Sequence, residues 1–299
     1  MKILTSDKRI VSQLDGTILV SPKAIHKFDG DVQVQIIVGS RELAHKAEAI
    51  NLPGLKFVQL LSAGYDGVDI EKYRSRNVLV SNAANVYGIG MAEYVVYGML
   101  MSAKRYNKGI RNSSIRYQRG YNWITELAGK IVGILGCGTI GLQIAKRLSG
   151  FDMTILGYDL FRDSCDYVEK IYKNLNEFLP LCDYLIITVP YNESTQGMIN
   201  ADFLSKCKKN ATIINVGRIG LIKDVDFLEA LKENKEMSAI LDMFEVFPNP
   251  ITNPYRRLSN VKVLPGITAI SQEITTRREK LVKENISRLL NNEKPLFVL

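Results

Sequence analysis

Residues Ile131-Val132-Gly133-Ile134-Leu135-Gly136-Cys137-Gly138-Thr139-Ile140-Gly141 form the stretch that decides the fold. An apolar run typical of a buried strand leads directly into three glycines spaced as G-x-G-x-x-G, and a helical pattern follows to Leu148. In a dinucleotide-binding βαβ unit the first glycine makes a tight turn and the second lets the backbone approach a pyrophosphate. The third lets the helix pack closely on the strand. The context therefore predicts a dinucleotide-binding loop at Gly136, Gly138 and Gly141.

Two further features extend this loop into a cofactor site. The amides of Thr139 and Ile140 open the predicted helix, where they would meet the phosphate charge. Asp159 lies 18 residues after Gly141, at the end of the next predicted strand. A carboxylate there accepts hydrogen bonds from the ribose hydroxyls and repels a 2′-phosphate, which favours NAD over NADP. Asp159 is alternatively a turn residue at a strand end, and Arg162 is placed to attract a 2′-phosphate.

Short apolar runs alternate with helical stretches along most of the chain. The expected strands are residues 17–20, 34–38, 57–61 and 78–80 in the first part, and residues 131–135, 153–158, 184–189, 212–216, 238–242 and 261–264 in the second. Alternation of this kind indicates parallel βαβ units, and near-continuous apolar strands indicate sheets covered on both faces. The sequence therefore predicts an α/β fold with two doubly wound parallel-sheet domains.

Three longer segments stand apart from the short βα units. The pattern of residues 91–104 predicts a helix that is apolar on nearly every face, which is typical of a buried or interface helix. Residues 107–126 are polar and irregular, as expected for an arm between domains. Residues 274–291 predict a final helix long enough to pack on another part of the chain.

The composition limits the class of protein. The chain has 299 residues, of which 46% are hydrophobic and 23% charged, and a net charge of +8. Its basic residues are scattered and not interleaved with aromatics, which favours a solvated basic face over a nucleic-acid site. Four separated cysteines and two histidines (His26 and His45) predict no metal site. Free thiols, the absence of an apolar leader and the absence of a long apolar run predict a cytoplasmic protein without a membrane span.

Several ordered blocks resemble the D-isomer-specific 2-hydroxyacid dehydrogenases, which include glycerate, glyoxylate/hydroxypyruvate and phosphoglycerate dehydrogenases. The matching blocks are residues 61–69, 91–93, 127–141, 189–195, 215–218 and 241–244. The resemblance implies a Rossmann cofactor domain, residues 93–273, inserted into a flavodoxin-like substrate domain made of residues 1–92 and 274–299. It also implies a cleft site between the domains and a homodimer joined through residues 91–126.

The resemblance also assigns roles to individual residues. It implies that Arg218 is the catalytic arginine, which binds the substrate carboxylate and polarises the ketone. Backbone amides near Ala63 and Gly64 would hold the other carboxylate oxygen, and Asp242 would lie near the nicotinamide carboxamide. The remaining implied cofactor contacts are Val189, Pro190, Thr195, Val216 and Gly217. From the residues alone, Arg218 is alternatively an exposed strand-end arginine, and Asp242 a buried strand-end hydrogen-bonding residue.

Two positions depart from the family pattern. The family places its proton-donating histidine after the proline of a Pro-His block, but Gly266 stands there. Its partner glutamate corresponds to Phe247, and Glu245 lies two residues earlier. We therefore expect an NAD-dependent oxidoreductase for a small 2-hydroxy or 2-keto acid, of the glycerate, hydroxypyruvate or glyoxylate type, with impaired proton transfer.

Two alternatives stay open. The chain is either a catalytically inactive NAD(H)-binding sensor or scaffold, or an oxidoreductase with another proton donor. Tyr65 and Tyr87 are candidates for that donor, although no spacing rule supports either.

Overall fold

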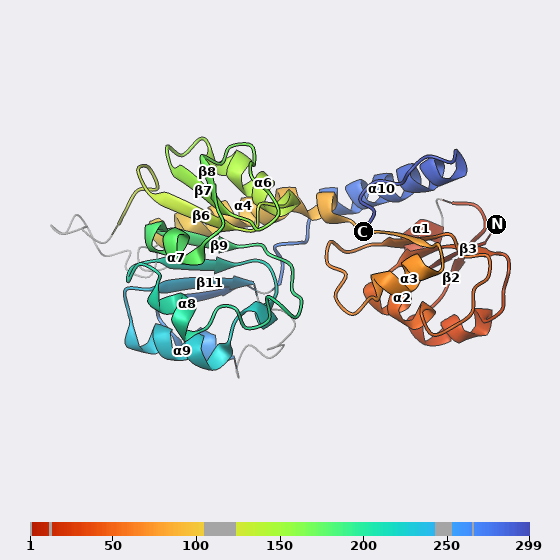
Figure 1. Ribbon diagram of the computed structural model, residues 1–299, viewed down its shortest axis with the longest axis horizontal. Coiled ribbons are helices and arrows are strands. Elements are labelled where there is room, and N and C mark those ends of the chain that lie inside the picture. Colours follow the sequence, from red (N-terminus) through yellow and green to blue (C-terminus); the bar gives the residue numbers. More distant parts are fainter. Residues whose placement is uncertain (1, 12–13, 105–123, 243–252, 265) are drawn as a thin grey trace, which may run out of the picture. The chain divides into compact units, whose positions relative to one another are not determined.

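The computed structural model describes residues 2–11, 14–104, 124–242, 253–264 and 266–299. The chain divides into two compact units (Figure 1), of which unit 1 comprises Met1–Tyr87 and Ser271–Leu299, and unit 2 comprises Gly88–Ile270. The first boundary between the units, at Tyr87/Gly88, falls inside helix α4 (Ala84–Ala103), which also contains the predicted boundary at residue 92. Each unit has its own sheet and its own core, so the two are described separately.

Unit 1 is built on a five-stranded parallel sheet with the order β2-β1-β3-β4-β5. Its strands are β1 (Lys2–Thr5), β2 (Thr17–Leu19), β3 (Val34–Gly39), β4 (Phe57–Leu60) and β5 (Leu79–Ser81). Because β1 stands first in the chain, this order is the 2-1-3-4-5 arrangement of flavodoxin-like folds. The expected flavodoxin-like sheet is therefore confirmed. Strand β1 is not among the strands predicted from the sequence.

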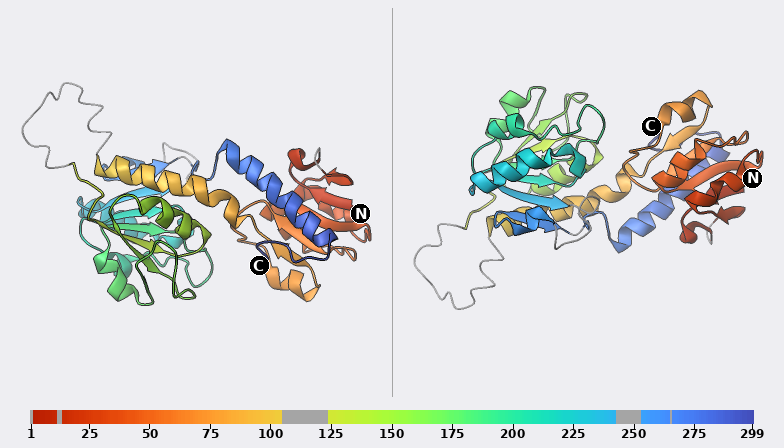
Figure 2. Two further views of the ribbon diagram at one scale, coloured as in Figure 1. Left: turned by 90° about the horizontal axis from the view of Figure 1, so that it is seen from above. Right: turned by 90° about the horizontal axis from the view of Figure 1, so that it is seen from below.

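Helices cover both faces of this sheet. The helical elements are α1 (Lys8–Val11), η1 (Pro22–Phe28), α2 (Arg41–Ala47), α3 (Ile70–Ser75), the start of α4 and α10 (Gln272–Leu290). Helix α10 lies along one face of the sheet (Figure 2), where Val282 and Ile286 cluster with Phe57, while Leu43 of α2 clusters with Val58 on the other face. The last helix thus returns the end of the chain to the first sheet.

Unit 2 is built on a seven-stranded parallel sheet with the order β12-β11-β10-β9-β6-β7-β8. Its strands are β6 (Ile131–Leu135), β7 (Thr154–Tyr158), β8 (Lys170–Tyr172), β9 (Tyr184–Ile187), β10 (Thr212–Asn215), β11 (Ser238–Asp242) and β12 (Val261–Leu264). The order reverses between β6 and β9, which is the switch point of the Rossmann arrangement. The carboxyl ends of all these strands share one edge, where such folds bind their ligands.

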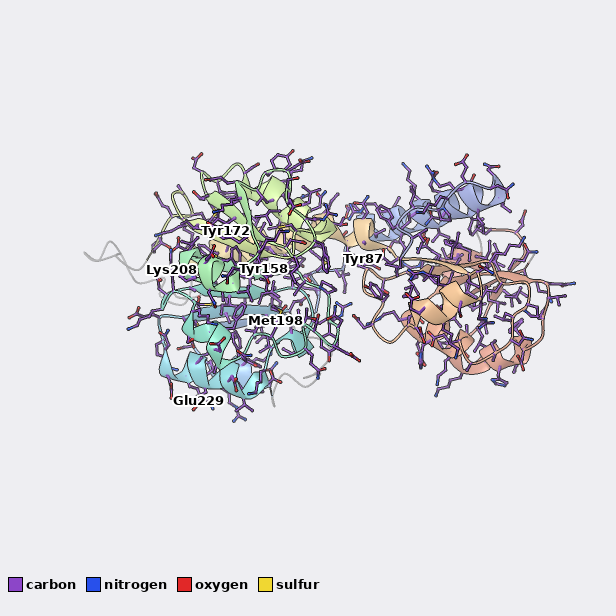
Figure 3. The ribbon with its side chains drawn as sticks, viewed as in Figure 1. Tyr87, Tyr158, Tyr172, Met198, Lys208 and Glu229 are labelled. Carbon is purple, nitrogen blue, oxygen red and sulfur yellow. The ribbon has the colours of Figure 1, made fainter. Side chains whose placement is uncertain are left out.

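The sequence reading expected six strands here, and the edge strand β8 is the seventh. It has only three residues, none of them fully buried, so it carries little hydrophobic signal. Tyr158 of β7 and Tyr172 of β8, labelled in Figure 3, both pack on Phe178, with ring centroids 5.9 and 5.8 Å away. The edge strand is thus held by aromatic packing.

The helices of unit 2 differ from the prediction mainly at the start of α4. They are α4 (Ala84–Ala103), α6 (Thr139–Leu148), α7 (Leu175–Phe178), α8 (Ala201–Ser205) and α9 (Asp224–Glu233), with short 3-10 turns η2 (Leu179–Leu181), η3 (Ile219–Leu221) and η4 (Pro254–Arg257). Helix α4 begins at Ala84 instead of Met91, and Gly98 lets it lie against Ile240 of the sheet. Of the predicted arm, residues 107–123 lie outside the described residues.

Candidate functional site

The three glycines after β6 each meet a different steric demand. Gly136 has a φ of +101°, and a Cβ there would lie 2.9 Å from the Val189 nitrogen. A Cβ on Gly141 would lie 2.3 Å from the Gly136 oxygen, so this glycine allows α6 to pack on β6. A Cβ on Gly138 would meet nothing within 4 Å. Gly136 and Gly141 therefore serve the fold, whereas Gly138 borders open space.

That space lies at the N-terminus of α6. Gly138 is the N-cap residue and supplies no side chain to the first turn, so the amides of Thr139 and Ile140 have no side-chain cap. The first amides of a helix lack intrahelical partners and carry a partial positive charge. An uncapped helix start beside open space fits a pyrophosphate, and these residues of unit 2 therefore fit a dinucleotide.

Asp159 connects the next loop to the glycine loop. Its Oδ2 accepts from the Cys137 amide at 2.9 Å, and its Oδ1 accepts from the amides of Phe161 and Arg162 at 2.9 and 3.0 Å. Burial alone would raise the pKa of this carboxyl, but the three amides and the Arg162 charge outweigh it and lower the pKa. Asp159 is thus an ionised turn residue, and its Oδ2 retains capacity for one ribose hydroxyl.

The loop after β9 closes the other side of the glycine loop. Thr188 Oγ1 donates to the Gly136 oxygen at 2.7 Å, a contact that the sequence reading missed. Val189 follows directly, and Thr195 Oγ1 donates back to the Pro190 oxygen at 2.8 Å. The predicted contact Val189 therefore borders the glycine loop, while Thr195 stabilises the turn that follows through its bond to the Pro190 oxygen.

The loop after β10 places Arg218 at the same edge of the sheet. Asn215, which is 4% exposed, accepts from the Gly217 amide at 3.0 Å and donates to the Arg218 oxygen at 3.0 Å. Val216 is buried, and Arg218 is half-buried with an extended backbone at the start of η3. Asn215 thus fixes the backbone that carries the arginine. It lies inside the block that resembles the family, but the sequence reading assigned it no role.

Asp242 ends β11, the strand next to β10. Its Oδ2 accepts from the Thr268 hydroxyl and, at 3.4 Å, from the Thr268 amide. Its Oδ1 is buried and has no hydrogen-bond partner among the described residues. A buried acceptor without a partner fits an amide donor from a bound ligand, such as the carboxamide of a nicotinamide ring.

Gly266 follows β12 at the same edge, and its φ of +73° lies in the left-handed region. An L-residue such as histidine is strained in that conformation. Phe247, which the resemblance places at the family's glutamate position, and Glu245 lie outside the described residues.

Unit 1 contains the predicted anion-binding turn after β4. Four groups engage its carbonyl oxygens: Tyr87 OH donates to Leu61 O, the Ala83 amide to Ser62 O at 2.9 Å, Asn82 Nδ2 to Ala63 O at 2.8 Å, and Ser62 Oγ to Gly64 O at 2.7 Å. Within the described residues, the amides of Ala63 and Gly64 donate to no group. The turn therefore keeps its hydrogen-bond donors available, as carboxylate binding requires.

The remaining chemical groups offer little else. Burial raises the pKa of the Cys137 thiol to about 12, and all four cysteines are free thiols. Among the described residues, no group of three or more His, Cys, Asp or Glu side chains could hold a metal ion. No helix in the described ranges is long and apolar enough to cross a membrane.

Known proteins resemble this chain over most of its length. The family model for the D-isomer specific 2-hydroxyacid dehydrogenase NAD binding domain matches residues 95–267. A glyoxylate reductase of Thermofilum pendens is 33% identical over 254 residues, which cover 81% of this chain and 74% of that protein. A D-3-phosphoglycerate dehydrogenase of Methanocaldococcus jannaschii is 32% identical over 263 residues, 85% of this chain, but the chain spans only 48% of that protein.

A solved structure shares the fold. The NADPH-dependent glyoxylate/hydroxypyruvate reductase of Sinorhizobium meliloti, crystallised with NADP and malonate, superposes with a TM-score of 0.80 at 24% identity. The alignment covers 100% of this chain and 96% of the reductase chain. The family-model match spans more than half of the 299 residues, and the glycine loop at residues 136–141 lies inside the matched range. The chain therefore belongs to the D-isomer-specific 2-hydroxyacid dehydrogenase family, and its Rossmann unit is an NAD(P)-binding domain.

Proposed function

We propose that this protein is an NAD-dependent oxidoreductase that reduces a small 2-keto acid to the 2-hydroxy acid, with a weakened proton-transfer step. The 2-keto acid would be of the hydroxypyruvate or glyoxylate type, for which relatives are named, and the 2-hydroxy acid of the glycerate type. The open space at Gly138 beside the uncapped start of α6 is the observation that carries the proposal, because it is the part of the loop that the fold itself does not use.

Asp159 is the basis for proposing NAD over NADP. Its pKa is lowered, so the carboxylate is negative at neutral pH and would repel a 2′-phosphate. At about 5 Å such repulsion amounts to about 1–2 kcal/mol in a half-exposed site, or about tenfold in affinity. The exposed side chain of Arg162 opposes this preference without removing it, because three backbone amides hold the carboxylate in place.

The substrate side of the reaction rests on Arg218 and on the turn in unit 1. A guanidinium is planar and always charged, so it suits a carboxylate and a developing alkoxide. We assign to Arg218 the binding of the substrate carboxylate and the polarisation of the ketone. We assign the other carboxylate oxygen to the amides of Ala63 and Gly64, which lack partners among the described residues. The bound reduced cofactor supplies the hydride.

The proton is the weak part of this chemistry. Gly266 has no side chain to donate one, and Phe247 replaces the carboxylate that would have supported a histidine. The Tyr87 hydroxyl already donates a hydrogen bond to the Leu61 oxygen, so its proton is not directed at a substrate. General acid catalysis is worth about 10²–10⁴ in rate. With water as the proton source, reduction should proceed slower by roughly that factor.

The second candidate function is an NAD(H)-binding sensor or scaffold without turnover. The observation that favours it is the double replacement at positions 247 and 266, since a site under no demand for acid catalysis keeps neither residue of the pair. Its cofactor site would be the same. The two functions therefore differ only in whether a 2-keto acid is converted.

Assembly and location complete the proposal. We propose a homodimer joined through residues 91–126, of which α4 contributes Tyr97, half exposed at 50%. Four unpaired thiols suit a reducing compartment, and we therefore propose a cytoplasmic location.

The test of function combines binding with product identification. Calorimetric titration of the full chain with NADH should show binding in the micromolar range, about 8 kcal/mol. Incubation with NADH and glyoxylate or hydroxypyruvate should then yield glycolate or D-glycerate in a 1:1 ratio to NADH consumed. NADH absorbance and chromatography of the acid would measure the ratio, and a chiral column would identify D-glycerate. Binding without any product would favour the sensor, and absence of NADH binding would refute both functions.

A further inference from the structure

Thr268 is buried where the chain turns back after β12. It is 1% exposed, and both its hydroxyl and its amide donate to Oδ2 of Asp242 on the neighbouring strand. Gly266, two residues earlier, adopts a φ of +73°, and the Ile270 amide donates to the Ile267 oxygen at 3.0 Å. Residues 267–270 therefore form a tight turn that holds Thr268 against the end of β11.

The contact treats the two oxygens of Asp242 differently. Oδ2 receives both donors from Thr268, whereas Oδ1 is buried with no partner in the part of the chain that the structure describes. A carboxylate fixed through one oxygen has a fixed direction for the other. Leaving a buried acceptor unsatisfied is unfavourable unless a ligand or partner completes it.

We propose that Thr268 is a positioning residue that holds the Asp242 carboxylate so that Oδ1 accepts the carboxamide N–H of the nicotinamide ring. The proposal rests on the proposed function, because it needs a nicotinamide cofactor in unit 2. It adds a residue to that site, since Thr268 would act through Asp242 and would not touch the cofactor itself. Its hydroxyl would fix the orientation of the ring end of the cofactor, while the glycine loop holds the pyrophosphate end.

The experiment compares NADH with ADP-ribose, which lacks the nicotinamide. Binding of both to the full chain is measured by calorimetry, and the fluorescence lifetime of bound NADH reports how firmly the ring is held. Thr268→Val keeps the shape but removes the hydroxyl donor, so Asp242 would no longer be held in the direction of the carboxamide. Weakening of that one charge-assisted hydrogen bond should lower NADH affinity about tenfold and shorten the lifetime. ADP-ribose affinity should not change, and Thr268→Ser should restore NADH binding.

Thr212 offers a matched control. It is a buried threonine, 6% exposed, at the opposite end of β10, and its Oγ1 hydrogen-bonds to Ser238 Oγ at 2.9 Å. Thr212→Val also removes a buried hydroxyl contact between neighbouring strands, but should leave the affinities for NADH and ADP-ribose unchanged. If Thr268→Val does not fold, Thr268→Ala serves in its place, and Thr268→Ser alone still tests whether the hydroxyl suffices.

The outcomes separate this proposal from the proposed function. Equal losses of NADH and ADP-ribose affinity would mean that Thr268 only supports the fold, and no loss of either would mean that it positions nothing. Both results overturn the role of Thr268 and leave NAD binding intact. A wild-type chain that binds neither compound would instead refute the proposed function, and the role of Thr268 with it.

Discussion

Replacing Gly138 with alanine should separate cofactor binding from folding. The residue has φ −75° and ψ −160°, which any L-residue adopts, and an added Cβ would meet nothing within 4 Å. Alanine should therefore leave the thermal midpoint unchanged or raise it slightly, by up to about 1 kcal/mol of reduced chain entropy or about 2–4 °C. The folded protein loses no contact.

Cofactor binding should respond in the opposite direction. The Cβ would occupy the space into which we place the pyrophosphate, and would push it off the amides at the start of α6. Hydrogen bonds to a charged group contribute about 1.5–3 kcal/mol each, so losing one or two costs about 3 kcal/mol. NADH affinity should thus fall about 100-fold.

Gly141→Ala is the matched comparison within the same loop. Its Cβ would lie 2.3 Å from the Gly136 oxygen, so this variant should be destabilised by about 1–3 kcal/mol through overpacking. Differential scanning calorimetry measures the two midpoints, and titration calorimetry the NADH affinities. Unchanged NADH affinity in Gly138→Ala would refute the pyrophosphate assignment, and a midpoint lowered as far as that of Gly141→Ala would refute the open space.

Three further predictions concern the rest of the site. NADH should bind about tenfold more tightly than NADPH because of the Asp159 carboxylate; equal calorimetric affinities would remove the ribose assignment. Arg218→Ala should reduce kcat/KM for a 2-keto acid at least about 100-fold, as expected for a lost charged ligand, with the NADH dissociation constant unchanged; unaltered keto-acid kinetics would show that Arg218 is not the carboxylate ligand. The double variant Phe247→Glu with Gly266→His should raise kcat about tenfold or more. Gly266→His alone should mainly lower the free energy of unfolding, by about 1–2 kcal/mol, because position 266 has a φ of +73°. A single variant as active as the double would contradict the paired roles.

Most of the fold could be predicted from hydrophobic patterns. Runs such as residues 34–38 and 212–215 are buried on both faces of their sheets, which is why they read as continuous apolar segments. The early start of α4 could not be predicted, because Gly88 and Gly90 disfavour a helix locally. Gly88 packs so closely on Gln143 that a Cβ would lie 3.0 Å from its Cγ, so tertiary packing outweighs local propensity there.

The candidate site was predictable only where its chemistry follows local spacing. The glycine loop and Asp159 lie at fixed intervals along one βαβ unit, and both are where the spacing predicts. Asn215 and Thr268 act through contacts that no spacing rule specifies. The bond from Thr268 to Asp242 spans 26 residues and exists only because β11 and β12 are neighbours in the sheet.

The most direct test of the central claim is the steady-state kcat of the wild-type protein for glyoxylate and hydroxypyruvate with saturating NADH. Family chemistry without a protein proton donor should lie about 10²–10⁴-fold below ordinary enzyme rates of about 1–10³ s⁻¹, with NADH bound normally. A wild-type kcat well above about 10 s⁻¹ on any simple 2-keto acid would contradict the account, because another group would then have to donate the proton that Gly266 cannot.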